Sequence, residues 1–144
     1  MALRNEEKHR TEWTWLQRVQ ANRALPWLAS LGWMAFIFTL SGQSTMPDWA
    51  PKFELRDVVG HLVAFGILGL LLRWAFGSAG VKQPALWAFG AVIVYAFSDE
   101  FHQRFVPGRH SDPFDLLVDA VGAGLALLLF EQWLRRRARR RFAD

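Results

Sequence analysis

The chain has 144 residues, enough for one domain. Hydrophobic residues make up 52% of it, charged residues 21%, and cysteine is absent, which excludes a disulfide scaffold, a cysteine-ligated metal site, a redox thiol and a disordered chain. Basic residues gather in the tails, because residues 1–24 carry five basic and three acidic side chains and residues 135–144 carry six arginines and one aspartate. This pattern is typical of a membrane protein and does not indicate a nucleic-acid partner.

The elements predicted in chain order begin with a short helix at residues 5–20. It has Trp13, Leu16 and Gln20 on one side, which suits a helix lying on the membrane surface. Four apolar segments follow. The second and fourth are near the roughly 20 residues that a membrane span needs, and the first and third are shorter. The four segments run from Leu25 to about Leu40, from Val58 to Phe76, from Pro84 to about Ser98 and from Pro113 to Leu134. The sequence therefore predicts an all-α fold, a four-helix transmembrane bundle with a short N-terminal interfacial helix.

Lys and Arg placement predicts the orientation of the spans. If both termini are cytoplasmic, 13 Lys and Arg residues lie on the inner side and 4 on the outer side, in line with the positive-inside rule. Four tryptophans then fall at the inner ends of the spans, where indole rings favour the headgroup layer: Trp27, Trp74, Trp87 and Trp133. We expect a cytoplasmic amphipathic segment at 1–24, a four-span domain at 25–134 and a basic cytoplasmic tail at 135–144.

In this topology the remaining polar side chains gather at the outer ends of the spans. They come from three segments of the sequence: Asp57 and His61, then Asp99, Glu100, Gln103 and Arg109, and finally Asp115 and Asp119. Ionisable groups at membrane depth cost about 2.5–3.5 kcal/mol each on insertion scales, so those that occur are paired, hydrated or functional. Asp115, Asp119 and Gly122 follow an i, i+4, i+7 stripe, and Glu100 and Gln103 share a face. The pattern predicts a polar pocket.

These residue types suit acid–base chemistry on a ligand. Glu100 or Asp119 would act as general base, His61 as its acid–base partner, and Arg109 as a clamp for phosphate or carboxylate. The further ligand-binding candidates are Gln103, Asp115 and Asp57. His61, Glu100 and Asp119 would also suit a divalent metal, but no compact metal-binding spacing such as His-x-x-x-His occurs, so no metal site is predicted and the cofactor is unknown.

Structural roles are the alternative for several of these residues. Asp112 and Pro113 form a good helix start, and Asp115 would then meet the positive end of the helix dipole. Arg109 would neutralise a neighbouring carboxylate, and His61 would serve helix packing.

Two blocks of sequence carry a family resemblance. The first is Asp57-x-x-x-His61, and the second is Glu100-x-x-Gln103-x-x-x-Pro107-Gly108-Arg109, followed by Asp115-x-x-x-Asp119-x-x-Gly122. Through these blocks the chain resembles the VanZ-like family of bacterial integral membrane proteins. It departs from the usual pattern at Val58, where Lys is common, at Phe65, where Tyr is common, and at Asp119, where Asn is usual.

The resemblance implies a multi-pass protein of the bacterial inner membrane with no established reaction. Because the family is named for a member linked to teicoplanin resistance, it also implies an effect on glycopeptide susceptibility. The residues leave three functions open: an enzyme acting on an envelope lipid or precursor headgroup, a protein that binds such a headgroup or an anionic lipid without catalysis, and a structural or accessory subunit of a larger membrane complex. Protein partners or a homo-oligomer would accompany the third.

Overall fold

Four helices make up the computed structural model, which describes residues 23–43, 54–107 and 113–141. They are α2 (Ala24–Ser41), α3 (Glu54–Ser78), α4 (Pro84–Gln103) and α5 (Pro113–Arg141), and the described residues contain no strand. The predicted all-α fold is therefore confirmed, and each helix contains its predicted apolar segment. The helix predicted within residues 5–20 lies outside the described part of the chain.

Three of the described helices are long and apolar enough to cross a membrane. These segments are Ala24–Ser41, Val58–Ser78 and Pro113–Arg140. The remaining helix, α4, has 20 residues and carries Asp99, Glu100 and Gln103 in its last turns. The predicted third span stops near Ser98, but the helix continues to Gln103. The polar residues of this added segment lower the mean hydropathy of α4.

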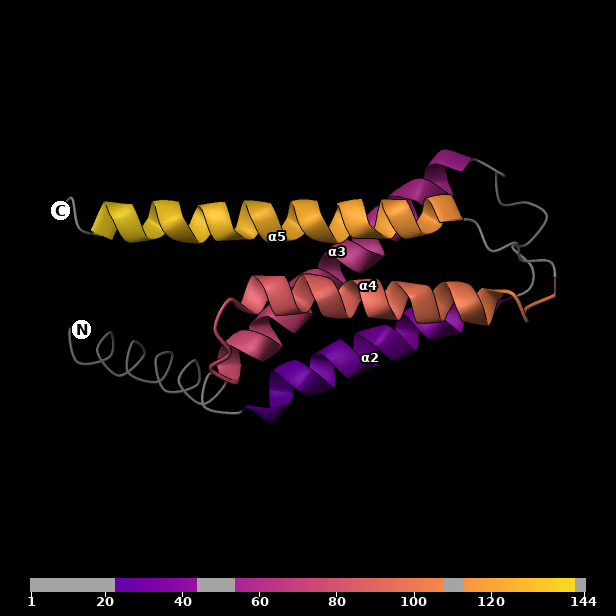
Figure 1. The fold of residues 1–144 in the computed structure, drawn as a ribbon, viewed down its shortest axis with the longest axis horizontal. Coiled ribbons are helices and arrows are strands. Elements are labelled where there is room, and N and C mark those ends of the chain that lie inside the picture. The colour runs from indigo at the N-terminus through magenta and orange to yellow at the C-terminus, as the bar shows by residue number, and fades with distance from the viewer. Residues whose placement is uncertain (1–22, 44–53, 108–112, 142–144) are drawn as a thin grey trace, which may run out of the picture.

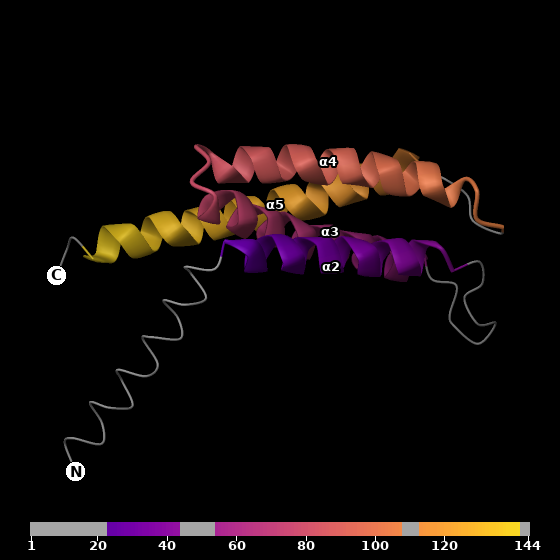
Figure 2. The same cartoon turned by 90° about the horizontal axis from the view of Figure 1, so that it is seen from below.

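All four helices run lengthwise along the bundle (Figures 1 and 2). We call the end where α2 and α4 finish and α3 and α5 begin the polar end, at the right of Figure 1, and the opposite end the tail end. Helix α3 packs against each of the other three, whereas α2 and α4 touch only lightly. Helix α3 is thus the centre of the bundle.

Small residues bring α3 and α5 close together. A Cβ atom added at Gly122 would fall on the backbone of Leu62, 2.8 Å from its Cα, and one added at Gly69 would meet the side chain of Ala123 at 3.5 Å. Without bulky side chains at these positions the two backbones approach closely, as in many membrane helix pairs. The core around this contact is fully or nearly fully buried: Phe65, Leu68, Leu72, Val92, Ala96, Ala123 and Leu127.

A tight turn joins α3 to α4 at the tail end. Gly80 has a φ of 76°, which favours glycine, and the N–H of Val81 donates to the carbonyl of Phe76 to close the last turn of α3. Pro84 then begins α4, a position where its missing N–H costs no helical hydrogen bond. The turn returns the chain alongside α3, which places the end of α4 at the polar end.

Candidate functional site

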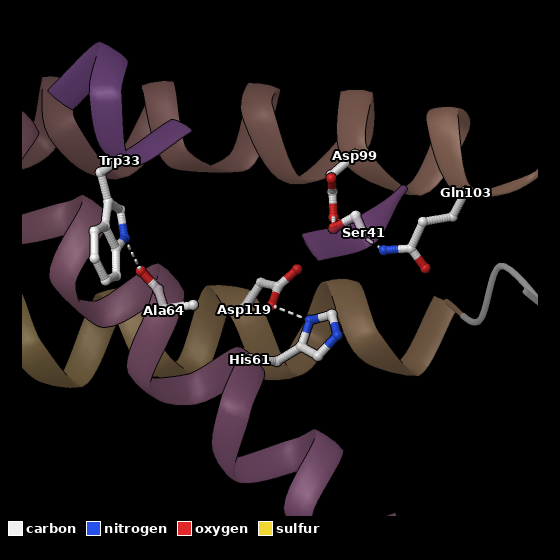
Figure 3. A network of polar contacts seen from close by, with 7 residues as sticks. All are labelled: Trp33, Ser41, His61, Ala64, Asp99, Gln103 and Asp119. Carbon is white, nitrogen blue, oxygen red and sulfur yellow. Dashed lines mark hydrogen bonds and ion pairs between the residues drawn. The ribbon is translucent and has the colours of Figure 1, made fainter. Parts of the chain in front are cut away.

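Every described helix contributes a side chain to one group of polar residues at the polar end (Figure 3). We call this group the polar cluster. It consists of Ser41 from α2, His61 from α3, Asp99, Glu100 and Gln103 from α4, and Asp119 from α5. Ser41, Asp99, Glu100, Gln103 and Asp119 are all less than 9% exposed, so the cluster is an internal feature of the bundle.

The most buried member of the cluster is Asp119, which pairs with His61. The Nδ1–H of His61 donates to Oδ1 of Asp119 at 2.8 Å, and the two side chains are 18% and 1% exposed. Because Nδ1 is engaged, the second ring nitrogen of His61, Nε2, is on the side of the ring away from Asp119 (Figure 3). A carboxylate that holds one nitrogen of an imidazole fixes the ring orientation and leaves the other nitrogen for proton transfer.

Asp99 joins α2 to α4 within the same cluster. Its Oδ2 accepts hydrogen bonds from the hydroxyl of Ser41 at 2.8 Å and from the amide of Gln103 at 2.9 Å. Its other oxygen, Oδ1, is buried and has no hydrogen-bond partner among the described residues. A buried acceptor without a donor costs free energy, so this oxygen is a position where a donor from a ligand would be stabilised.

The predicted stripe on α5 faces α3. Asp119 contacts His61, and Gly122 lies against Leu62, the next residue along α3. Asp115, one turn before Asp119, is partly exposed and contributes to the negative potential at His61, as does Asp99. The structure thus brings these residues to a common end from α3, α4 and α5.

Four further residues were predicted for the site, and the structure buries two of them and does not describe the side chains of the other two. Glu100 is 7% exposed and Gln103 is 2% exposed, and the amide of Gln103 is bonded to Asp99 within the protein. Asp57 lies in the first turns of α3, and its side chain is outside the described part of the structure. Arg109 also lies outside the described residues, so its predicted role as an anion clamp stays a prediction.

Two residues of the cluster, Ser41 and Asp99, were not predicted to have a role in the site. Ser41 lies just beyond the predicted first span, which ends at about Leu40, and Asp99 was predicted at the outer end without a role. The spacing of Asp99 and Gln103, four residues apart on one helix, was a signal for their pairing. No comparable signal marks Ser41, because its partner is 58 residues away.

A second interhelical pair lies toward the tail end. Nε–H of Arg73 on α3 donates to Oε1 of Glu131 on α5 at 2.8 Å, and the guanidinium lies 5.1 Å from the ring centroid of Phe130. This pair is 12 residues beyond His61 and Asp119 on both helices, which is about 18 Å of helix. Helices α3 and α5 therefore run in the same direction and are joined by polar contacts at two levels.

The polar cluster can accept hydrogen bonds and exchange a proton with a bound molecule. Its ionisable members are three buried carboxyl groups and one partly exposed imidazole, a set that favours a ligand carrying hydrogen-bond donors. Within residues 23–43, 54–107 and 113–141, no group of three or more His, Cys, Asp or Glu side chains is arranged to hold a metal ion.

Comparison with known proteins places these observations in a family. The VanZ/LLP1 family model matches residues 11–135, which include all four described helices up to the last turns of α5. An uncharacterised protein of Schizosaccharomyces pombe, C11E3.10, is 30% identical over 83 residues, 58% of this chain and 51% of that protein. The matched region is thus about half the length of the curated relative. No solved structure matches the chain.

Proposed function

The chain belongs to the VanZ/LLP1 family of membrane proteins, and from that premise we propose that its polar cluster binds the headgroup of a membrane lipid or lipid-linked envelope precursor. One observation carries the proposal: all four described helices direct polar side chains to a single buried group centred on the His61–Asp119 pair. Buried ionisable groups within a membrane are costly and mark functional sites, and lipid headgroups are the polar groups that the membrane itself supplies at that surface.

In this proposal His61 is the residue that exchanges a proton with the headgroup. Asp119 holds Nδ1, so Nε2 of His61 is the atom that would accept a proton from a hydroxyl or amine of the ligand. Asp99 would accept a hydrogen bond through Oδ1, the oxygen that neither Ser41 nor Gln103 uses. His61 and Asp99 would have these roles whether the protein only binds the headgroup or also modifies it.

The proposal includes an orientation of the protein in the membrane. In this proposal the polar end lies at the outer surface of the cytoplasmic membrane and both termini lie in the cytoplasm, as the positive-inside pattern of the sequence predicts. The exposed arginines at the end of α5, Arg135 to Arg140, support this orientation, because they would meet anionic lipid on the inner side. An altered headgroup population at the outer surface is also the route by which a family member would change teicoplanin susceptibility.

Thermal unfolding of the purified protein with water-soluble short-chain phospholipids tests headgroup binding. We expect a phosphoglycerol or phosphoethanolamine headgroup, each of which carries a hydrogen-bond donor, to raise Tm by an amount that corresponds to about 2.7 kcal/mol at a ligand concentration 100 times Kd. Phosphocholine carries no hydrogen-bond donor and should leave Tm unchanged. His61→Asn should remain folded but lose this shift, because the Asn amide can replace Nδ1 toward Asp119 while nothing replaces Nε2. His102→Asn, a change at a histidine outside the pair, should retain it.

The alternative, a structural or accessory subunit, rests on the same hydrogen bonds acting as links between helices. Ser41 to Asp99 and His61 to Asp119 each join two helices, and such links stabilise membrane bundles. If no headgroup raises the Tm of the wild-type protein while stoichiometric protein partners co-purify after gentle solubilisation, the alternative is correct. If His61→Asn retains the full headgroup shift, the assignment of His61 is wrong.

A further inference from the structure

An apolar groove runs along α4 beside the lightly packed contact with α2. It has a volume of about 610 Å³ and is lined by Met34 of α2, Phe76 of α3 and, on α4, residues between Trp87 and Ser98. Cavities of this size hold small ligands in many proteins. The 12 residues from Trp87 to Ser98 correspond to about 16 Å of helix, close to half of the hydrocarbon thickness of a bilayer.

Small residues of α4 form part of the groove wall. Gly90 and Ala91 both line it, and a Cβ atom added at Gly90 would meet nothing within 4 Å. The space beside Gly90 is therefore open and is large enough to accept a side chain without moving the backbone. The groove is shaped by the sequence of α4, which places these two small residues between Trp87 and Val94.

Just beyond the groove, the two helices that form its main walls change from apolar to polar at one level. On α4, Ala91 and Tyr95 line the groove, and four residues later Asp99 joins the polar cluster. On α2, Met34 lines the groove, and Ser41 lies seven residues later on the same helix face. Tyr95 donates to the carbonyl of Met34 at 2.6 Å, and Ser41 donates to Asp99 at 2.8 Å, so the two walls correspond level by level.

Aromatic rings lie at the opposite end of the groove. The rings of Phe76 and Trp87, which both line it, are 6.5 Å apart, and Trp27 packs edge-on against Phe76 at 5.2 Å. These rings limit the length of the groove toward the tail end. The groove therefore has an aromatic end, an apolar middle and a neighbouring polar cluster.

We propose that this groove holds the single acyl chain of an amphiphile whose headgroup is bound at the polar cluster. The inference rests on the proposed headgroup site and adds the class of ligand: one hydrocarbon tail, ended by the aromatic rings, attached to a head that carries a hydroxyl or ammonium donor for Asp99. An amphiphile is the ligand that matches the order of apolar and polar residues along both helices. A headgroup without a tail would not occupy the groove, which would then be filled by ordinary membrane lipid.

The polar cluster supplies the selectivity of this site. Lipid tails outside the protein are as apolar as the groove, so a tail gains packing contacts and no hydrophobic free energy when it enters. A tail stays in the groove because its headgroup is held by hydrogen bonds at the adjoining cluster. Occupancy of the groove by a tail is therefore expected to depend on His61. The length of the tail that fits in the groove is expected to depend on Trp87.

Photo-crosslinking in lipid nanodiscs tests the inference. The probe is a monoacyl phospholipid with a diazirine in its tail and the headgroup that raises Tm most, or phosphoglycerol if none does. We expect label on Met34 and on residues 87–95 of α4 in the wild-type protein, and a reduction to the level of the lipid-facing residues Leu125 and Leu128 in Gly90→Phe. Gly32→Phe is the matched control, because Gly32 also has nothing within 4 Å of an added Cβ and does not line the groove.

The outcomes separate this inference from the proposed headgroup site. Groove labelling that Gly90→Phe removes, Gly32→Phe retains and His61→Asn weakens supports the inference, as does a preference for longer tails in Trp87→Ala. Labelling spread evenly over all lipid-facing residues overturns it even if short-chain headgroups still raise Tm. Groove labelling that is unchanged in His61→Asn overturns the coupling between tail and head.

Discussion

At the scale of single residues, the position of Asp119 depends on its partner. A carboxyl group that is 1% exposed, in an apolar helix, loses its hydration, and the hydrogen bond from His61 offsets part of that cost. The family pattern usually has Asn at this position, and an Asn side chain can also accept a hydrogen bond from Nδ1–H of His61. The hydrogen bond, rather than the charge, is therefore expected to hold the two helices together here.

Substitutions at Asp119 separate the hydrogen bond from the charge. We expect Asp119→Asn to remain within about 1 kcal/mol of the wild-type free energy of unfolding, because the acceptor is kept. Asp119→Leu has a similar volume and no acceptor, and it should lose about 1–3 kcal/mol because Nδ1–H of His61 is left without its partner. Unfolding by SDS in mixed micelles measures both values, and equal losses in the two variants would show that the charge is needed.

Single residues also show where prediction from sequence ends. Hydropathy predicted that His61, Glu100, Gln103 and Asp119 lie at one end, since each interrupts or ends an apolar segment. Ser41 could not be identified, because a serine hydroxyl in a helix commonly bonds a carbonyl four residues earlier, as Ser30 does with Pro26. Only the packing of α2 beside α4 shows that Ser41 bonds Asp99 instead.

At the scale of helices, the contact between α3 and α5 positions the functional pair. The backbone of Leu62 lies against Gly122, one residue beyond His61 and three beyond Asp119, so the close approach brings the imidazole and the carboxyl into hydrogen-bond distance. The glycine was predicted from its place on the acidic stripe. The Arg73–Glu131 pair was not predicted, because the register between two helices is a property of their packing.

Gly122→Ala tests whether this close approach supports the fold. The new methyl group would overlap the Leu62 backbone, so α3 and α5 must separate, and we expect a loss of about 1–3 kcal/mol in the free energy of unfolding. Gly124→Ala on the same helix is the control, because its Cβ would meet only the Phe89 ring, at an ordinary 3.6 Å. Chemical unfolding in mixed micelles compares the two, and equal stability of both variants would contradict the role assigned to Gly122.

At the scale of the whole molecule, the central feature is that all four described helices carry polar groups to one end. Hydropathy predicted most ends of the helices to within a few residues, because the bilayer sets the length of an apolar segment. It did not predict that α2 packs mainly on α3 and only lightly on α4, which leaves the groove open. That arrangement depends on the shapes of many side chains together.

Labelling of single cysteines from outside intact cells tests most directly whether the polar end faces outward. The chain has no cysteine, so Phe105→Cys at the polar end and Ala138→Cys on the last turns of α5 each introduce one thiol, and both positions are exposed. A membrane-impermeant maleimide should label Phe105→Cys in intact cells and Ala138→Cys only after the membrane is permeabilised. Labelling of Ala138→Cys in intact cells, with Phe105→Cys protected, would contradict the account.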